Sequence, residues 1–270
     1  MESDIKGWDK SWSRINSDMQ QDRYMVEYAY SLIHWQEMEK RVQEKYGTFK
    51  DLKVIEIGSG RGEVALLMAL KGAKVTLLDF SPVALEKAAS LFGHFNCKAT
   101  FMKEDVFNMP QSMFGNYDIS MSFGFAEHFK YPKRQEVFKE HLSLLKDGGI
   151  SFISVPNAYC FVYRLSLLVL KLLHKWDVWE VPFTHSQLRR VAGRAGYPSY
   201  AIIGSSSFGA IDQFVVRNIL GFFAKRIGFF KFLMDSYCSK IRREIPSSLD
   251  YYFGYGLLLV GYQQRLRNAP

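Results

Sequence analysis

The stretch VIEIGSGRGE at residues 54–63 constrains the fold of this 270-residue chain more than any other. An apolar run that contains one carboxylate, Glu56, leads into three glycines within five residues. Glycines let a backbone bend sharply and approach a ligand closely. In an open parallel sheet, ligands bind beyond the carboxyl ends of the strands. We therefore expect a ligand at this turn and regard a tight turn without a ligand as the weaker alternative.

Strand-like and helix-like segments alternate at short spacing around this turn. Strands are expected at residues 53–57, 74–80, 99–105, 117–123 and 150–155, and later at 199–204 and 255–263. Helices are expected at residues 63–70, from Ser81 onward, at 134–145 and from Thr184, which is spaced from Gln187 as in a capping box. The pattern predicts a doubly wound α/β fold with a mostly parallel sheet. The last strand is expected to lie antiparallel at one side of the sheet.

The length fits one domain with insertions. Residues 1–50 have a helical pattern and are expected to form an N-terminal cap, and residues 51–156 are expected to form the ligand-binding core. The remainder, 157–270, belongs to the same domain but breaks the strand–helix rhythm twice. We expect these breaks, at about 157–182 and 208–244, to be helical lid insertions over the substrate.

The glycine spacing argues against a dinucleotide. That ligand calls for three glycines in the pattern G-x-G-x-x-G, and here Gly62 comes one residue too early. Glu56, two residues before the first glycine, would lie badly beside a pyrophosphate and well beside an ammonium group. The turn is therefore expected to bind a ligand with a positive charge and no phosphate.

Two further strand ends complete the description of this ligand. Asp79 ends the second strand, 19 residues after Gly60, where a carboxylate can bind both hydroxyls of a ribose. Phe80 beside it can lie against a purine, and Asp105 after the third strand can accept a hydrogen bond from an adenine amino group. S-adenosylmethionine combines an ammonium, a ribose and an adenine without a phosphate.

The sequence VIEIGSGRGEVALLMALKGAKVTLLDFSPVALEKA resembles the nucleotide-binding half of class I S-adenosylmethionine-dependent methyltransferases. GFAEHF and LLKDGGISFISVPN are similar to the fourth and fifth strand regions of that family, and FTHSQLRRVAGRAGY extends the likeness more loosely toward its small-molecule members. The resemblance implies a Rossmann-like sheet of seven strands, with the last strand antiparallel. It also implies S-adenosylhomocysteine as the product of the cofactor.

The resemblance assigns cofactor roles to residues of four strand ends. The methionine part would lie against Glu56, Gly58, Ser59, Gly60 and Gly62, the ribose against Asp79, and the adenosine beside Phe80 and Ser81. The adenine would be framed by Glu104, Asp105 and Val106, and the sulfonium would be bordered by Ser122, Phe123 and Gly124.

Three side chains are candidates for catalysis. His128 follows the fourth strand closely and has an ordinary pKa that suits a general base, although it could equally start a helix and bond to backbone. Glu127 beside it could hold the substrate or only cap a helix. His185 is the weakest candidate because its place beside Thr184 also suits a helix start.

Marks of several methyltransferase subfamilies are missing. The fourth strand is followed by SFGF rather than by an Asn- or Asp-Pro-Pro-aromatic motif, and Cys160 lacks the setting of a nucleophilic cysteine. We recognise no clustered acids of the kind that form the metal site of catechol-type enzymes. We also find no second glutamate of the kind that protein-arginine enzymes carry. The broad small-molecule group remains.

The positive charge of the chain, +8 overall, is concentrated in residues 160–243, with 13 Lys and Arg against 4 Asp and Glu. In the first insertion Arg164, Lys171 and Lys175 recur at helical spacing among leucines. Such a helix can pack in the core, line a hydrophobic pocket or lie on a membrane surface. The charge also leaves a nucleic-acid partner open, as the less favoured alternative.

The three cysteines have no paired spacing, which favours a reducing, cytoplasmic location and no metal site. The longest apolar run, about 14 residues from Cys160, is shorter than the roughly 20 that span a bilayer. We therefore expect no transmembrane helix, and a peripheral membrane contact stays open. The sequence indicates no oligomeric state.

These observations favour a methyltransferase that acts on O, N or C of a largely apolar small molecule, such as a natural-product, quinone or lipid-linked intermediate. The rival hypothesis is an RNA methyltransferase that uses the basic segment. A third is a cofactor-binding or scaffold protein without catalysis, which a blocked cavity beside the sulfonium position would favour.

Overall fold

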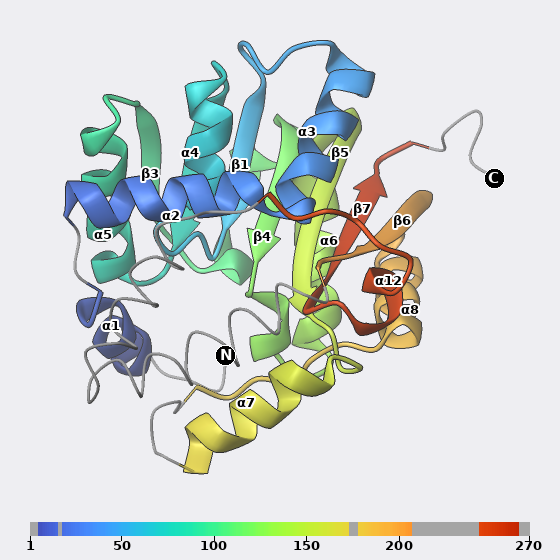
Figure 1. Ribbon diagram of the computed structural model, residues 1–270. Coiled ribbons are helices and arrows are strands. Elements are labelled where there is room, and N and C mark those ends of the chain that lie inside the picture. Colours follow the sequence, from blue (N-terminus) through green and yellow to red (C-terminus); the bar gives the residue numbers. More distant parts are fainter. Residues whose placement is uncertain (1–4, 16–17, 173–177, 207–242, 265–270) are drawn as a thin grey trace, which may run out of the picture.

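The computed structural model describes residues 5–15, 18–172, 178–206 and 243–264. Its centre is a seven-stranded sheet in the order β3-β2-β1-β4-β5-β7-β6, with helices on both faces (Figure 1). The strands are β1 (Lys53–Ile57), β2 (Lys74–Asp79), β3 (Ala99–Lys103), β4 (Tyr117–Phe123), β5 (Leu145–Pro156), β6 (Ser199–Gly204) and β7 (Gly256–Tyr262). The predicted doubly wound, mostly parallel fold is confirmed. Nearly all of the expected insertion at 208–244, and Lys175, lie outside the described residues.

Helices pack on both faces of the sheet and form a separate hydrophobic core with each face. One core joins the sheet to α2 (Met19–Ser31), α3 (Ile33–Tyr46), α4 (Glu63–Leu70) and α5 (Pro82–His94). The other joins it to α6 (Lys133–Leu144) and α8 (His185–Ala195). Apolar side chains alternate between the two cores along the strands, because neighbouring residues of a strand point to opposite faces.

The remaining helices are short or peripheral. They are α1 (Ile5–Ser13), α7 (Phe161–Leu172), α12 (Asp250–Phe253), and the 3-10 turns η1 (Val106–Asn108), η2 (Gln111–Met113) and η3 (Ala126–His128). The helical pattern of residues 1–50 thus corresponds to α1, α2 and α3. The Ser81 cap of α5 and the Thr184–Gln187 capping box of α8 are present as the sequence predicts.

The last strand departs from its expected place. β7 is antiparallel, as predicted, but it lies between β5 and β6 instead of at one side of the sheet. Every residue of β7 is buried, whereas β6 has mostly half-buried or exposed residues. An entirely apolar strand is stabilised most when both faces and both edges are covered, so β6 takes the edge.

The fifth strand also begins earlier than the sequence indicates. The expected strand at 150–155 follows a KDGG turn, but β5 starts at Leu145 and includes that turn. Its pairing with β4 shifts in register between Tyr117 and Ile119. The glycines therefore form an irregularity within a strand rather than the loop before it.

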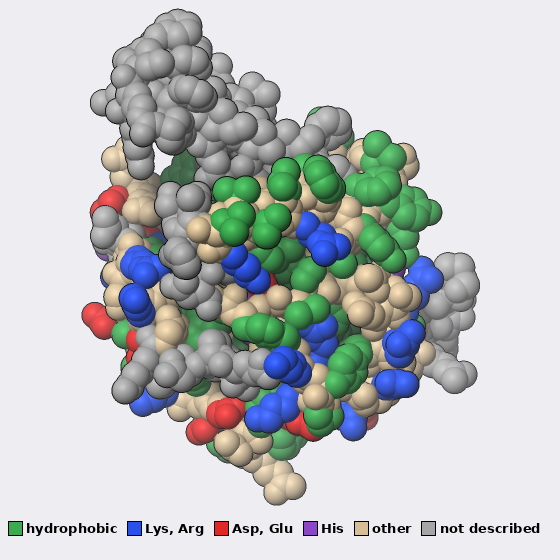
Figure 2. All heavy atoms as spheres, turned by 90° about the horizontal axis from the view of Figure 1, so that it is seen from below, with side chains coloured by type: hydrophobic (Ala, Val, Ile, Leu, Met, Phe, Trp, Pro, Cys, Tyr) green, Lys and Arg blue, Asp and Glu red, His purple; other side chains and the backbone are tan. Residues whose placement is uncertain are grey.

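The helix of the first insertion, α7, has one face toward the domain and one toward solvent. Tyr163 is buried, while Arg164 and Lys171 are exposed. Exposed apolar side chains lie on the same helix: Phe161, Leu165, Leu168, Val169 and Leu172. Figure 2 views the molecule from below, the side on which α7 lies in Figure 1, and shows hydrophobic and basic side chains together there. Within the described residues, no helix is long and apolar enough to cross a bilayer.

Candidate active site

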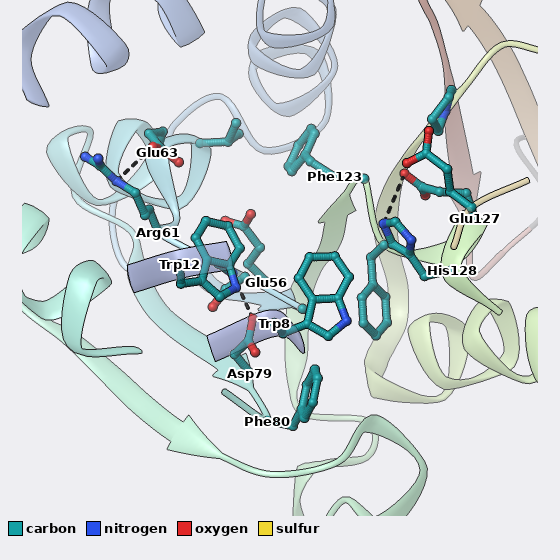
Figure 3. A pocket seen from close by; sticks show the side chains of 18 of the residues that line it. Trp8, Trp12, Glu56, Arg61, Glu63, Asp79, Phe80, Phe123, Glu127 and His128 are labelled. Carbon is teal, nitrogen blue, oxygen red and sulfur yellow. Dashed lines mark hydrogen bonds and ion pairs between the residues drawn. The ribbon is translucent and has the colours of Figure 1, made fainter. Parts of the chain in front are cut away.

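A cavity of about 420 Å³ opens at the carboxyl ends of the central strands. One end is formed by the loop after β1 and the end of β2, around Glu56 and Asp79. The other end is formed by Glu127 and His128 of η3 together with Tyr163 of α7. Figure 3 shows the two ends apart, with Trp12 of α1 near Glu56 and Asp79 and with Trp8 between that end and His128. The cavity therefore lies where ligands bind in open parallel sheets.

The glycine turn after β1 has the conformation that its sequence predicts. Gly58, Gly60 and Gly62 all have positive φ, at 58°, 52° and 73°. A Cβ atom at Gly60 would lie 2.5 Å from Cη2 of Trp12, and one at Gly58 would overlap the ring of Phe125. Aromatic rings thus approach this backbone at distances that a side chain would prevent. The turn needs glycine because of the positive φ angles and because of this close approach.

Glu56 is a buried carboxylate without a cationic partner among the described residues. Its Oε2 accepts a hydrogen bond from the backbone N–H of Ala65 at 3.2 Å. Burial raises the pKa of Glu56 well above its usual range, and the nearby carboxylates of Glu63 and Asp79 raise it further. An ammonium group beside Glu56 would relieve both effects. The residue therefore fits the amino group of a methionine moiety.

Asp79 lies at the end of β2, against the glycine turn. Its Oδ2 accepts from the N–H of Gly60 and its Oδ1 from the N–H of Ser81, both at 2.9 Å. Burial raises its pKa, and these hydrogen bonds oppose the rise. Two fixed donors hold the carboxylate at the cavity wall, and each oxygen keeps a second lone pair for a ligand hydroxyl.

Ser81 has a structural role next to this carboxylate. Its side chain caps α5 by accepting from the N–H of Ala84 at 3.1 Å, and its hydroxyl donates to Asp9 of α1. Ser81 is fully buried and is not among the described residues that line either cavity. It therefore holds α1 and α5 together rather than facing a ligand.

A second cavity, of about 60 Å³, adjoins the first at Gly58, Asp79 and Phe80. The predicted adenine residues come together here: Glu104, Asp105 and Val106. Phe107, Phe125 and Phe129 supply aromatic walls. This aromatic-lined cavity adjoins Asp79, and its aromatic walls suit a purine ring.

The end of β4 supplies two of its three predicted residues to the main cavity. Phe123 and Gly124 line it. Ser122 does not, because adjacent strand residues point to opposite faces. The Ser122 hydroxyl is fully buried and bonds to Nε2 of His141 of α6 at 3.0 Å. Ser122 therefore stabilises the packing of α6 against β4.

His128 faces the end of the cavity that lies away from Asp79. Its Nδ1 is 2.8 Å from the carbonyl oxygen of Trp179, which assigns the proton to Nδ1. Its Nε2 lies 3.8 Å from Oε1 of Glu127, and its ring meets that of Trp8 edge-on at 4.9 Å. Burial lowers the pKa of His128, so the ring is neutral at pH 7 and Nε2 carries a lone pair. The geometry thus presents a proton acceptor.

Two carboxylates lie at the same end of the cavity. Glu127 is buried, and burial raises its pKa to about 8. Glu180 is also buried and accepts a hydrogen bond from the hydroxyl of Tyr163. The charge of Glu180 contributes to the raised pKa of Glu127, which places the two groups within electrostatic reach of each other.

His185 is separated from this arrangement. Its Nε2 donates to the carbonyl oxygen of Tyr251, and its ring stacks with that of Tyr159 at 5.8 Å. It begins α8 directly after the Thr184 cap and is not among the described residues that line the main cavity. We accordingly retain His128 and Glu127 as the candidate residues and assign His185 to the packing of α8.

Sequence reasoning missed several residues of the main cavity. From the sequence, Trp8 and Trp12 are recognisable only as candidates for buried contacts of a helical segment, and Tyr163, Glu180 and Tyr255 do not stand out. The i, i+4 spacing of the two tryptophans indicates one helix face but not what that face covers. The other three residues come from separate loops and helices, so no local spacing could have joined them.

Comparison with known proteins identifies residues 54–149 as matching a family described as a methyltransferase domain. The ubiquinone biosynthesis O-methyltransferase of Bordetella bronchiseptica is 29% identical over 164 residues, which cover 57% of this chain and 66% of that protein. The enzyme of the same name from Escherichia fergusonii is 31% identical over 118 residues, or 43% and 48% of the two chains. The chain thus matches about half to two thirds of the length of these relatives.

Solved structures share the fold across most of the chain. A putative sarcosine dimethylglycine methyltransferase from Galdieria sulphuraria has a TM-score of 0.58 at 14% identity, covering 85% of this chain and 84% of its own. A magnesium protoporphyrin IX methyltransferase from Synechocystis, solved with S-adenosylhomocysteine bound, has a TM-score of 0.55 at 17% identity and covers 95% and 92%. Identities this low support the fold rather than a substrate.

Proposed function

We propose that this chain is a class I, S-adenosylmethionine-dependent methyltransferase, in line with its methyltransferase domain. Its proposed activity is the transfer of a methyl group to a small molecule with a largely apolar body. The observation that carries the proposal is the continuous cavity from Glu56 and Asp79 to His128. One end has the chemistry that the cofactor requires, and the other has a proton acceptor with room beside it.

The cofactor assignment depends on chemical fit. Glu56 would pair with the amino group, Asp79 would accept hydrogen bonds from the ribose, and the cavity beside Asp105 would take the adenine. The bound cofactor supplies an electrophilic methyl group on a sulfonium, so the protein needs only to position an acceptor and take up its proton. We assign Phe123 and Gly124 to the border of that group, at the end of β4.

The acceptor half of the cavity supports an apolar substrate body. Leu167 and Leu170 of α7 line the main cavity together with Pro156 and Trp8. Such walls exclude water and hold a hydrophobic ligand. We assign α7 the role of a lid over the acceptor and His128 Nε2 the role of general base.

The rival hypothesis of an RNA substrate depends on the basic segment, about half of which lies outside the described residues. The test is to incubate the protein with S-adenosylmethionine that carries a tritiated methyl group and a total cell extract. We expect label in the organic-soluble small-molecule fraction, insensitive to ribonuclease. Label that precipitates with RNA and is released by ribonuclease would favour the rival instead.

Asp79→Ala is expected to weaken S-adenosylhomocysteine binding by about 1.5–3 kcal/mol, because each hydrogen bond to a charged group contributes in that range. Titration calorimetry measures the change. The control is Asp147→Ala, which removes an exposed carboxylate at the start of β5 and should leave the affinity unchanged. An Asp79 variant that binds as tightly as the parent would rule out the assigned ribose contact.

We also propose that the outer face of α7 contacts anionic lipid. It combines the exposed apolar residues Phe161, Leu168 and Leu172 with the exposed charges of Arg164 and Lys171. Arg164→Glu with Lys171→Glu should reduce sedimentation with phosphatidylserine vesicles several-fold, while S-adenosylhomocysteine affinity stays the same. A parent protein that does not sediment with these vesicles would overturn this proposal.

A further inference from the structure

The acceptor end of the main cavity contains two buried carboxyl groups, those of Glu127 and Glu180. Glu127 is 2% exposed and Glu180 is 8% exposed. Within the described part of the chain, Oε2 of Glu127 is fully buried and has no hydrogen-bond partner. A buried oxygen of this kind is costly unless a ligand supplies a donor. The cavity is therefore incomplete at this end without a donor group.

Two arginines in or beside the cavity wall have partners other than these carboxyl groups. Arg61 is the one described Lys or Arg in the cavity wall, and it pairs with Asp22 and Glu63 near the cofactor end. Arg134 of α6 contacts the backbone of η3, and its positive charge partly opposes the rise in the pKa of Glu127. Its N–H groups donate to the backbone carbonyls of Glu127, Phe129 and Val181 rather than to a carboxylate.

Aromatic rings surround the same region. Tyr163 and Tyr255 meet edge to face, with ring centroids 5.3 Å apart, and both line the cavity. The ring of Trp8 forms a third wall, against His128. Aromatic faces attract a cation, most strongly when the site excludes water. Carboxylates and rings together thus favour a positively charged guest.

We propose that the acceptor group of the substrate is an amine, which enters as an ammonium and is held by Glu127 and Glu180 against the rings of Tyr163 and Tyr255. This inference rests on the proposed methyl transfer and narrows its acceptor atom to nitrogen. The substrate class is an amine with an apolar body, because Leu167 and Leu170 line the same cavity and Leu167 packs with Tyr163.

The proton balance of this arrangement is complete. The bound ammonium gives one proton to Nε2 of His128 and becomes a neutral amine with a free lone pair. That lone pair forms the N–C bond to the cofactor methyl, the electron pair of the broken C–S bond stays on sulfur, and the product is a methylated ammonium. Glu127 and Glu180 keep their partner throughout, and His128 passes its proton to water.

Other acceptor groups fit less well. A carboxylate or phosphate would add negative charge beside Glu127 and Glu180, which already repel each other. A hydroxyl can donate one hydrogen bond but brings no charge to offset two carboxylates. An ammonium supplies several donors and a positive charge at once.

Binding of matched probes tests the proposal without turnover. The probes are 2-phenylethylamine, tryptamine and dodecylamine, each compared with the alcohol and the carboxylic acid of the same skeleton. Titration calorimetry is performed at pH 7 on the full chain saturated with S-adenosylhomocysteine. We expect at least one amine to bind roughly tenfold or more tightly than its alcohol, as for hydrogen bonds to charged groups, and its acid not to bind.

Two variants locate the binding site. Glu127→Gln and Glu180→Gln keep the size of each side chain and remove its charge, and each should weaken the amine roughly tenfold or more. Glu86→Gln makes the same change at an exposed position of α5 and should have no effect. Unchanged binding of S-adenosylhomocysteine to each variant confirms that the variant folds. If one of the two variants does not fold, the other still tests the proposal.

The outcomes separate the inference from the proposed function. Preference for an alcohol or acid, failure of all three amines, or amine binding that survives both variants would each overturn the inference. In all of these cases S-adenosylhomocysteine would still bind. If S-adenosylhomocysteine itself does not bind to the parent protein, the proposed function fails instead.

Discussion

His128→Ala is expected to lower turnover on the order of 10²–10⁴-fold, the usual contribution of general acid–base catalysis. The variant removes Nε2, the nitrogen that we propose as the general base, while the Trp179 carbonyl that orients the ring remains. Turnover is the rate at which S-adenosylhomocysteine forms. The acceptor is supplied by the fraction of the cell extract that takes up the tritiated methyl group.

The affinity for S-adenosylhomocysteine serves as the control, since His128 lies at the other end of the cavity from Asp79. It should barely change in the variant. Near-normal turnover by His128→Ala would leave His128 as a structural residue of η3. Catalysis would then depend on the position of the acceptor alone.

The pH dependence of the parent protein should have the same origin. Burial lowers the pKa of His128 below its ordinary value of 6.5, so the neutral base persists at pH 6.5. As pH falls through the lowered pKa, the ring gains a proton and turnover declines. The acid limb of the rate profile is therefore expected below pH 6.5, and it should be absent in His128→Ala.

Asp22→Ala is expected to lower the free energy of unfolding by about 3–5 kcal/mol, the usual cost of leaving one partner of a buried ion pair without the other. Asp22 is fully buried on α2 and pairs with Arg61, which is 3% exposed. Its second oxygen is 2.6 Å from Nδ1 of His94 at the end of α5. Urea denaturation followed by circular dichroism measures the change.

Two comparisons give this result its meaning. Glu27→Ala removes an exposed carboxylate from the same helix and should change stability by no more than about 0.5 kcal/mol. In Asp22→Ala the buried guanidinium of Arg61 has lost one of its two carboxylate partners and keeps Glu63. Adding Arg61→Met removes that buried charge and should recover part of the loss. If Asp22→Ala is no more destabilising than Glu27→Ala, the ion pair does not anchor α2 to the glycine turn.

The parts of the site that the sequence predicted belong to the continuous run from β1 to β4. Strand periodicity and glycine spacing are local, so the sequence alone predicts that Glu56, Gly60 and Asp79 lie at the carboxyl edge of the sheet. In the structure the N–H of Gly60 donates to Asp79 across 19 residues of sequence. Parallel pairing of β1 and β2 makes such a separation predictable.

The parts that the sequence did not predict depend on contacts between distant segments. Trp12 covers Gly60 and Asp22 pairs with Arg61 because α1 and α2 pack over the glycine turn. No periodicity in residues 1–50 encodes that docking. The acidic acceptor end likewise joins Glu127 to Glu180 and Tyr163, which lie on different segments.

Two failures within the core have simpler physical causes. Ser122 follows the family pattern in sequence, but strand alternation turns its hydroxyl toward His141 and away from the cavity. β7 was expected at one side of the sheet, yet its unbroken apolar character requires cover on both edges. Alternation and burial are readable from sequence, and both should be weighed before a family pattern is applied to every residue.

Calorimetric titration of the parent protein with S-adenosylhomocysteine, and separately with NAD, tests the central claim most directly. Glu56 beside the glycine turn favours a ligand with an ammonium group, and the early Gly62 departs from the dinucleotide pattern. We predict that S-adenosylhomocysteine binds at one site per chain and that NAD does not bind. Tighter binding of NAD than of S-adenosylhomocysteine would contradict the assignment of this cavity to methyl transfer.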